Sequence, residues 1–144
     1  MLIRASLSFQ TQHMENAYQK FYDLEIWMKS RALKNEVWQL VKTFPSEEKY
    51  RLSDQIIRSS RSVNSNIAEG HGRFTFKDQL HFCIIARGSL SETYNHLIDA
   101  HDCEYVSQEK LRYFKDCIEE ITKILNGYIS YLRKNHISIP KSTF

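Results

Sequence analysis

The 144 residues suit one domain, since a chain of this length encloses a hydrophobic core without metal or disulfide staples. Its 42% hydrophobic and 26% charged residues are ordinary globular usage and exclude a disordered chain. Only 4 Gly and 2 Pro are present, too few for the turns of a many-stranded sandwich or barrel, so the composition favours helices.

Net charge and cysteine content indicate which partners and which cellular compartment to expect. A net charge of +3 permits a polyanionic partner without indicating one by itself. Cys83, Cys103 and Cys117 form an odd set without paired spacing, which is typical of reduced thiols. No stretch approaches the ~20 apolar residues of a membrane span, and the first residues lack the layout of a secretory signal. We therefore expect a cytoplasmic protein without contact to a membrane.

The two ends of the chain differ in composition from its middle. Residues 1–20 show no helical stripe and are rich in Ser, Gln, Thr and Asn, which predicts a flexible N-terminal arm. Residues 136–144 have the composition of a flexible C-terminal tail. The folded domain is expected between them, over residues 21–135.

Apolar residues spaced by three and four predict the first two helices. The first is expected over residues 23–43, where Pro45 ends it. The second follows from residue 52 and stops at Gly70 and Gly72. The same spacing repeats at Leu52, Ile56, Ser60, Val63 and Ile67, where all but Ser60 are apolar.

Two heptad patterns predict the third and fourth helices. Thr75 and Asp78 resemble an N-terminal cap of the third helix, and Ser107 opens the fourth. The third heptad comprises Phe76, Leu80, Cys83, Arg87, Leu90, Tyr94, Leu97 and His101. The fourth comprises Leu111, Phe114, Ile118, Ile121, Leu125, Tyr128 and Leu132. Four helices on short links bury such stripes only against each other, so we predict an all-α, antiparallel up-down-up-down four-helix bundle.

Some apolar residues exceed what one seam needs, namely Trp27, Trp38, Cys117, Ile124 and Tyr131. Periodicity leaves two interpretations open, a wide core face or a subunit interface.

A line of polar residues borders the apolar stripe of the second helix, at Ser59, Ser62, Asn66, Glu69 and Arg73. A similar polar line on the third helix contains Ser89, Glu92 and His96, beside the small residues Ala86 and Gly88. The two lines are expected to meet where the backbones approach closely. We interpret them as a structural hydrogen-bond network of Asn66, Glu69, Arg73, Ser89 and Glu92, which fixes helix register.

The alternative interpretation of these polar residues is an active site. Glu69 or Glu92 would then act as a base. His71 or His96 would be its partner. No nucleophile, orienting group or oxyanion loop accompanies them, so we predict no catalytic residues. A helical ribonuclease remains the weaker alternative.

Metal and cofactor templates also fail on spacing. A di-iron bundle needs Glu-x-x-His on two helices, whereas this chain offers a single Asp78-x-x-His81. His101 and Cys103 lack a second pair at zinc-site spacing, and no phosphate-binding glycine loop is present. We therefore predict no metal and no cofactor.

Residues 65–70 (SNIAEG), 72–73 (GR) and 86–92 (ARGSLSE) resemble proteins encoded within intervening sequences of bacterial large-subunit ribosomal RNA genes. The resemblance extends over residues 21–134, with Asn64 and Arg87 as departures from the family pattern. It implies a four-helix bundle that assembles as a homopentameric barrel. Relatives in this family are similar to the accessory variability determinant of diversity-generating retroelements, which implies nucleic acid and a reverse transcriptase as partners.

Basic residues recur on the second helix away from its apolar stripe, at Arg51, Arg58 and Arg61, and Lys29 and Lys34 extend the set from the first helix. We expect Lys34, Arg51, Arg58 and Arg61 to contact phosphates of RNA or DNA without reading sequence, since no helix-turn-helix or zinc finger is present. The prediction is a non-enzymatic, nucleic-acid-binding homo-oligomer. The alternatives are an ordinary solvated face and a protein-interaction scaffold.

Overall fold

The computed structural model describes residues 20–137, which form four α-helices and two short 3-10 helices and contain no strand. The helices are α2 (Glu25–Val41), α3 (Leu52–His71), α4 (Phe76–Asp102) and α5 (Gln108–Ile137), with η1 (Phe21–Asp23) before α2 and η2 (Ser46–Glu48) before α3. The predicted all-α class and the four helices are confirmed. The predicted arm lies outside the described residues except for residue 20. The predicted tail lies outside them except for residues 136 and 137, which belong to α5 and not to a flexible tail.

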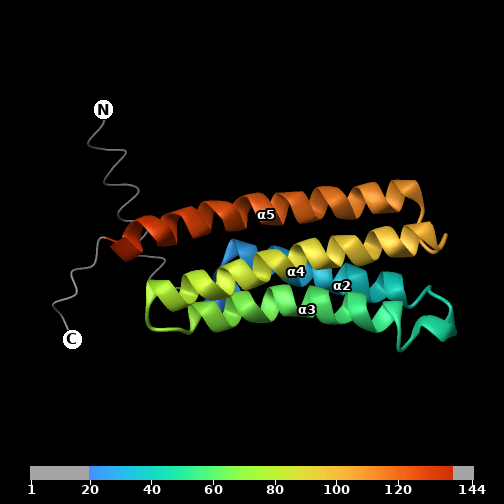
Figure 1. Cartoon of the computed structure of the whole chain (residues 1–144), viewed down its shortest axis with the longest axis horizontal. Coiled ribbons are helices and arrows are strands. Elements are labelled where there is room, and N and C mark those ends of the chain that lie inside the picture. The colour runs from blue at the N-terminus through green and yellow to red at the C-terminus, as the bar shows by residue number, and fades with distance from the viewer. Residues whose placement is uncertain (1–19, 138–144) are drawn as a thin grey trace.

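The four helices lie lengthwise beside one another as a bundle (Figure 1). The α2–α3 and α4–α5 connections lie at one end, and the α3–α4 connection lies at the other. Contacts join α2 to α3, α3 to α4, α4 to α5 and α5 back to α2, so the helices form a ring around one core. The contact between α3 and α4 is the most extensive, and the contact between α2 and α5 is the least. No helix of the described part is long and apolar enough to cross a bilayer.

Short polar side chains set the first residues of the later helices. Thr75 Oγ1 accepts a hydrogen bond from the backbone N–H of Asp78 at 3.2 Å, as its sequence position predicts for an N-terminal cap. Ser107 Oγ accepts from the backbone N–H of Lys110 at 3.1 Å in the same way. Both caps satisfy amide groups that lack a partner inside the helix.

Glu48 joins two connections at one end of the bundle. Its Oε2 atom accepts a hydrogen bond from the backbone N–H of Leu52 at 3.2 Å, which caps α3. Its Oε1 atom accepts from the hydroxyl of Tyr105, in the α4–α5 connection, at 3.2 Å. The Tyr105 ring also packs against Phe44, with the ring centroids 5.4 Å apart. The α2–α3 and α4–α5 connections are therefore bonded to each other.

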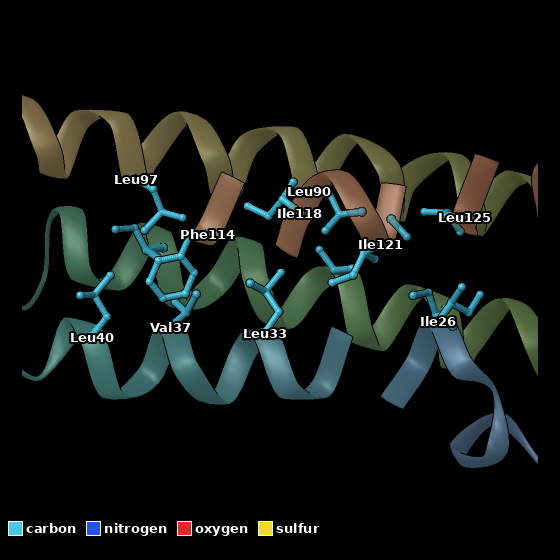
Figure 2. Packing of buried hydrophobic residues seen from close by; sticks show 14 of the residues in the cluster. Ile26, Leu33, Val37, Leu40, Leu90, Leu97, Phe114, Ile118, Ile121 and Leu125 are labelled. Carbon is cyan, nitrogen blue, oxygen red and sulfur yellow. The ribbon is translucent and has the colours of Figure 1, made fainter. Parts of the chain in front are cut away.

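The core draws apolar residues from all four helices. Figure 2 shows Phe114 between Val37 and Leu97, with Leu33 and Leu40 pointing inward from α2. The predicted stripe of α5 is buried at Leu111, Phe114, Ile118, Ile121, Leu125 and Leu132. Tyr128 is only half-buried, and Ile129 is buried instead.

The predicted heptad of α4 is correct along one line and wrong along the other. The first line is buried at Cys83, Leu90 and Leu97, as expected, whereas Phe76 at its start is half-buried. The second predicted line, Leu80, Arg87, Tyr94 and His101, is only half-buried. The line one residue earlier is buried in its place and consists of Gln79, Ala86, Thr93 and Ala100. The small side chains of Ala86, Thr93 and Ala100 let α4 lie closer to α3 than large ones would. Gln79 instead donates a hydrogen bond to the hydroxyl of Tyr128 on α5 at 2.6 Å.

Gly70 shows how close α3 and α4 come. A Cβ atom at Gly70 would lie 2.8 Å from the Cβ atom of Phe82 and 3.3 Å from the carbonyl oxygen of Gln79. Neither distance leaves room for a side chain without movement of the neighbouring helix. A glycine is therefore required where the end of α3 packs on the start of α4.

Candidate nucleic-acid interface

Hydroxyl groups cross the buried seam between α3 and α4. Ser89 donates to Ser62 with 2.9 Å between the Oγ atoms. The Oγ1 atom of Thr93 lies 2.9 Å from Ser59 Oγ and 2.8 Å from the carbonyl oxygen of Ser89. Asn66 Nδ2 donates to the carbonyl oxygen of Ser62 at 2.8 Å and to its Oγ at 3.0 Å. Asn66 of α3 and Ser89 of α4 thus both bond to Ser62, where the two predicted polar lines meet.

The charged residues assigned to the same network lie outside this seam. Arg73 donates to Glu69 at 2.6 Å across one helical turn, and both side chains are exposed. The Arg73 guanidinium also lies over the ring of Phe82 on α4, 4.8 Å from its centroid. Glu92 is exposed on α4, with its Oε1 atom 3.4 Å from His96 Nε2. The structure therefore places Glu69, Arg73 and Glu92 in local surface pairs and not in the buried network.

The arginines predicted to contact phosphates are exposed on α3 and at its start. Arg51 precedes the first turn of α3, while Arg58 and Arg61 lie on its outer side. Arg58 pairs with Asp54 at 3.6 Å, where both side chains are solvated. The Arg61 guanidinium extends toward α2 and lies 5.6 Å from the ring centroid of Trp38. Arg61 therefore connects the basic side of α3 to α2.

The facing side of α2 carries alternating aromatic and basic residues. They follow one helical line at successive spacings of four, three, four and four, which are Trp27, Arg31, Lys34, Trp38 and Lys42. The Arg31 guanidinium lies 5.7 Å from the Trp27 ring centroid, and Lys42 Nζ lies 5.2 Å from that of Trp38. We name these five residues, together with Arg58 and Arg61, the α2–α3 basic face.

Sequence reasoning missed part of this face. The predicted basic set does not include Arg31 and Lys42, and Trp38 is predicted only as surplus apolar surface. The regular spacing of aromatic and basic residues along α2 is the sequence signal that identifies this part of the face. Lys29 was expected to join the basic set, but it faces α5 and its Nζ lies 2.7 Å from Glu120 Oε1. The hydrogen bond to Glu120 is the main cause that raises the pKa of Lys29.

A second surface feature is the seam between α2 and α5. A groove of about 560 Å³ runs along it, and its lining includes Glu36, Leu40, Glu109 and Tyr113. Hydrogen bonds to Glu36 and Cys117 are the first causes that raise the pKa of Tyr113. Both signs of charge line this side of the bundle, since Lys110 and Lys29 accompany the carboxylates, so it lacks the row of unpaired cations that α2 and α3 carry.

The cysteines differ in reactivity. Burial raises the pKa of Cys83 to about 12, and burial is also the main cause that raises the pKa of Cys117. Both thiols are therefore poor nucleophiles at neutral pH. Cys103 is exposed after the end of α4. Within residues 20–137, no three His, Cys, Asp or Glu side chains gather as metal ligands would.

Comparison with known proteins gives a family and a similar structure. Residues 22–127 match the family described as 23S rRNA-intervening sequence protein. A crystal structure of a protein with unknown function from the S23 ribosomal protein family of Bacteroides thetaiotaomicron is similar, with a TM-score of 0.68 and 27% sequence identity. That match covers 73% of this chain and 95% of the other. No curated protein matches the chain.

Proposed function

Because this chain belongs to the 23S rRNA-intervening sequence protein family, we propose that it is a non-enzymatic, homo-oligomeric protein that binds nucleic acid through its α2–α3 basic face. In this proposal the bundle has antiparallel up-down-up-down order, and the protein acts in the cytoplasm. Lys34, Arg58 and Arg61 of this face, together with Arg51 at the start of α3, contact phosphates, so binding follows the backbone of RNA or DNA and not its sequence.

The uncompensated charge of the α2–α3 basic face carries the proposal. Among the described residues, Arg58 is the cation of this face that forms an ion pair, through Asp54. Lys34, Arg61, Arg31 and Lys42 form no ion pair within residues 20–137. A row of cations without carboxylate partners favours a polyanion, because each phosphate contact releases a bound counterion.

We propose a homopentamer as the working state, following the family resemblance. Ile84 and Ile85 on the outer side of α4 are 37% and 38% exposed, and burial of such side chains between subunits would be favourable. A ring would also present several basic faces to one nucleic acid, which raises the overall affinity above that of a single face. A reverse transcriptase is the protein partner that the resemblance supports.

The test measures affinity for unstructured RNA and DNA by fluorescence anisotropy over a range of salt concentrations. We expect affinity to fall steeply as salt rises, and the paired replacement of Arg58 and Arg61 by Ala to lower the slope of log K against log salt by about 1 to 2. The control replaces the exposed Arg112 and Arg133 of α5 by Ala, which should leave the slope unchanged. Binding that is absent, or insensitive to salt, would contradict the proposal. Light scattering on the same samples gives the number of subunits.

A protein-interaction scaffold is the second candidate. Tyr50 is 83% exposed in the connection before α3, and Phe74 is 87% exposed before α4, which are large aromatic areas for a surface. A scaffold would bind the reverse transcriptase without affinity for nucleic acid. Intact RNA at the end of the binding assay would count against the third candidate, a helical ribonuclease.

A further inference from the structure

The ring of Trp38 lies at the centre of the α2–α3 basic face and remains accessible. Its side chain is 42% exposed, although apolar surface of this size usually turns inward. Two cations from different helices accompany it, with Lys42 Nζ 5.2 Å and Arg61 Cζ 5.6 Å from the ring centroid. An exposed indole accompanied by two cations resembles the stacking surfaces that bind unpaired bases.

We propose that Trp38 is a stacking platform for an unpaired base, so that the preferred ligand of the α2–α3 basic face is single-stranded nucleic acid. This inference rests on the proposed function and makes it more specific. The base stacks on the indole in place of the Lys42 side chain, whose ammonium group then meets the neighbouring phosphate. Arg61 keeps its position beside the ring and contacts the next phosphate.

The arrangement of α2 supports a track longer than one nucleotide. Trp27 and Trp38 are eleven residues apart on the same line, which is about 16 Å along a helix axis. Arg31 and Lys34 lie between them in register. A strand that follows α2 thus meets cations on both sides of Trp38, as backbone-directed binding with interspersed stacking requires.

Trp27 is a structural contrast to Trp38 on the same line. Its ring is half-buried and packs edge-on against Phe21, with the centroids 5.3 Å apart. Its carbonyl oxygen accepts a hydrogen bond from Asn64 Nδ2 of α3 at 3.2 Å. Trp27 therefore helps to hold α2 on α3, whereas Trp38 is the accessible ring.

The surface fits a single strand better than a duplex. In a duplex the faces of the bases are already stacked on each other, so an indole on a helix surface meets only backbone and base edges. An unpaired base offers its face to the ring, and stacking of this kind contributes about 1 to 3 kcal/mol per base.

The direct test observes the indole itself. Trp27→Phe leaves Trp38 as the single tryptophan, because the chain contains two. Titration of this variant with oligo(dT) should quench the fluorescence of Trp38, and titration with a duplex of the same length should quench it much less. Equal quenching by both ligands, or quenching by neither while anisotropy reports binding, would overturn the inference.

Substitution provides the second test. Trp38→Ala should weaken oligo(dT) binding by about tenfold at constant salt while leaving the salt slope unchanged, because stacking releases no counterion. Trp38→Phe should restore most of the affinity. The control is Tyr113→Ala on α5, whose side chain is 47% exposed and therefore comparable, and which should bind as the parent does. Thermal unfolding of each variant establishes that the fold is retained.

The outcomes separate the two proposals. Salt-dependent binding that persists unchanged in Trp38→Ala leaves the proposed function in place and removes the stacking platform. A cation–π role that only supports the fold would lower the melting temperature of Trp38→Ala without changing its affinity. Loss of salt-dependent binding in the parent protein would remove the proposed function itself.

Discussion

The α3–α4 and α2–α5 seams close the same ring of helices by different means. Small side chains and crossing hydroxyls bring α3 and α4 together, with Gly70 against Phe82 and Thr93 against Ser59. The α2–α5 seam is more open, and its outer edge carries a solvated ion pair between Lys29 and Glu120. Close approach needs small residues, whereas a wide seam needs a large one to fill it. The two seams should therefore respond to opposite kinds of substitution.

The largest loss of stability is expected in the wide seam, which is the α2–α5 seam, where one aromatic ring fills the core. Phe114 is 1% exposed and lies in the core beside the α2–α5 groove. Phe114→Ala should lower the free energy of unfolding by about 4 kcal/mol, since it removes buried surface and leaves a cavity. Urea denaturation measures the loss. The adjacent Tyr113→Ala should lose only a small fraction of this amount, and equal losses would mean that the wide seam does not depend on its core residue.

The narrow seam, which is the α3–α4 seam, should lose stability when a side chain in it is enlarged. Gly70→Val places atoms where only 2.8 Å separates an ideal Cβ from Phe82, so we expect a loss of about 2 kcal/mol. Gly88 is the matched control, because a Cβ there meets nothing within 4 Å. Gly88→Ala should stabilise the helix by up to about 1 kcal/mol. Similar effects of the two substitutions on the urea midpoint would contradict close packing at Gly70.

A smaller effect is expected from the hydroxyls of the narrow seam. Thr93→Val keeps the shape of a side chain that is fully buried and removes the hydroxyl that contacts both Ser59 Oγ and the carbonyl oxygen of Ser89. The loss should be about 1 kcal/mol, as for one buried hydrogen bond. The control is Thr43→Val, whose hydroxyl donates a local hydrogen bond to the carbonyl oxygen of Leu40 at 2.7 Å, just beyond the end of α2. A double-mutant cycle with Ser59→Ala should show coupling between the two positions, and additive losses would argue against the bond.

The smallest loss of stability is expected for the ion pair at the outer edge of the wide seam. Lys29→Met removes an ion pair with an exposed carboxylate, and such pairs contribute little because water and salt screen them. The pKa of Lys29 is raised above 10.5, so its stabilising contribution is fully present below pH 10.5 and disappears as pH rises through the folded-state value. Unfolding curves of variant and parent should therefore converge above that pH. A difference in stability between variant and parent that increases above pH 10.5 would contradict the stabilising role of the Lys29 ammonium group.

Much of the fold was predictable because its signals are local. Thr75 and Ser107 cap helices that begin immediately after them, and an uninterrupted apolar stripe marks α5. The second seam of α4 was not predictable from its own heptad, since Leu80 and Tyr94 suit a core position better than Gln79 and Thr93 do. Which line is buried depends on the small residues of α3, and that pairing is not visible within one helix.

The candidate interface also has a part that was predictable from the sequence and a part that was not. The exposure of Arg58 and Arg61 followed from the position of the α3 stripe, because residues opposite a buried face are solvated. The contact between Arg61 and Trp38 depends on the register between two helices, which single-helix spacing does not determine. The buried polar network was expected where it lies, but its charged members are at the surface because burying an ion pair is costly.

The carboxylate of Glu48 has a consequence for how the bundle opens. Its two oxygens hold the first amide of α3 and the hydroxyl of Tyr105, so neither connection at this end is released without breaking a bond to the other. Local opening there should be a single event that involves both loops. A protease that cleaves the segment before α3 would thus report on the integrity of a loop more than fifty residues later in the chain.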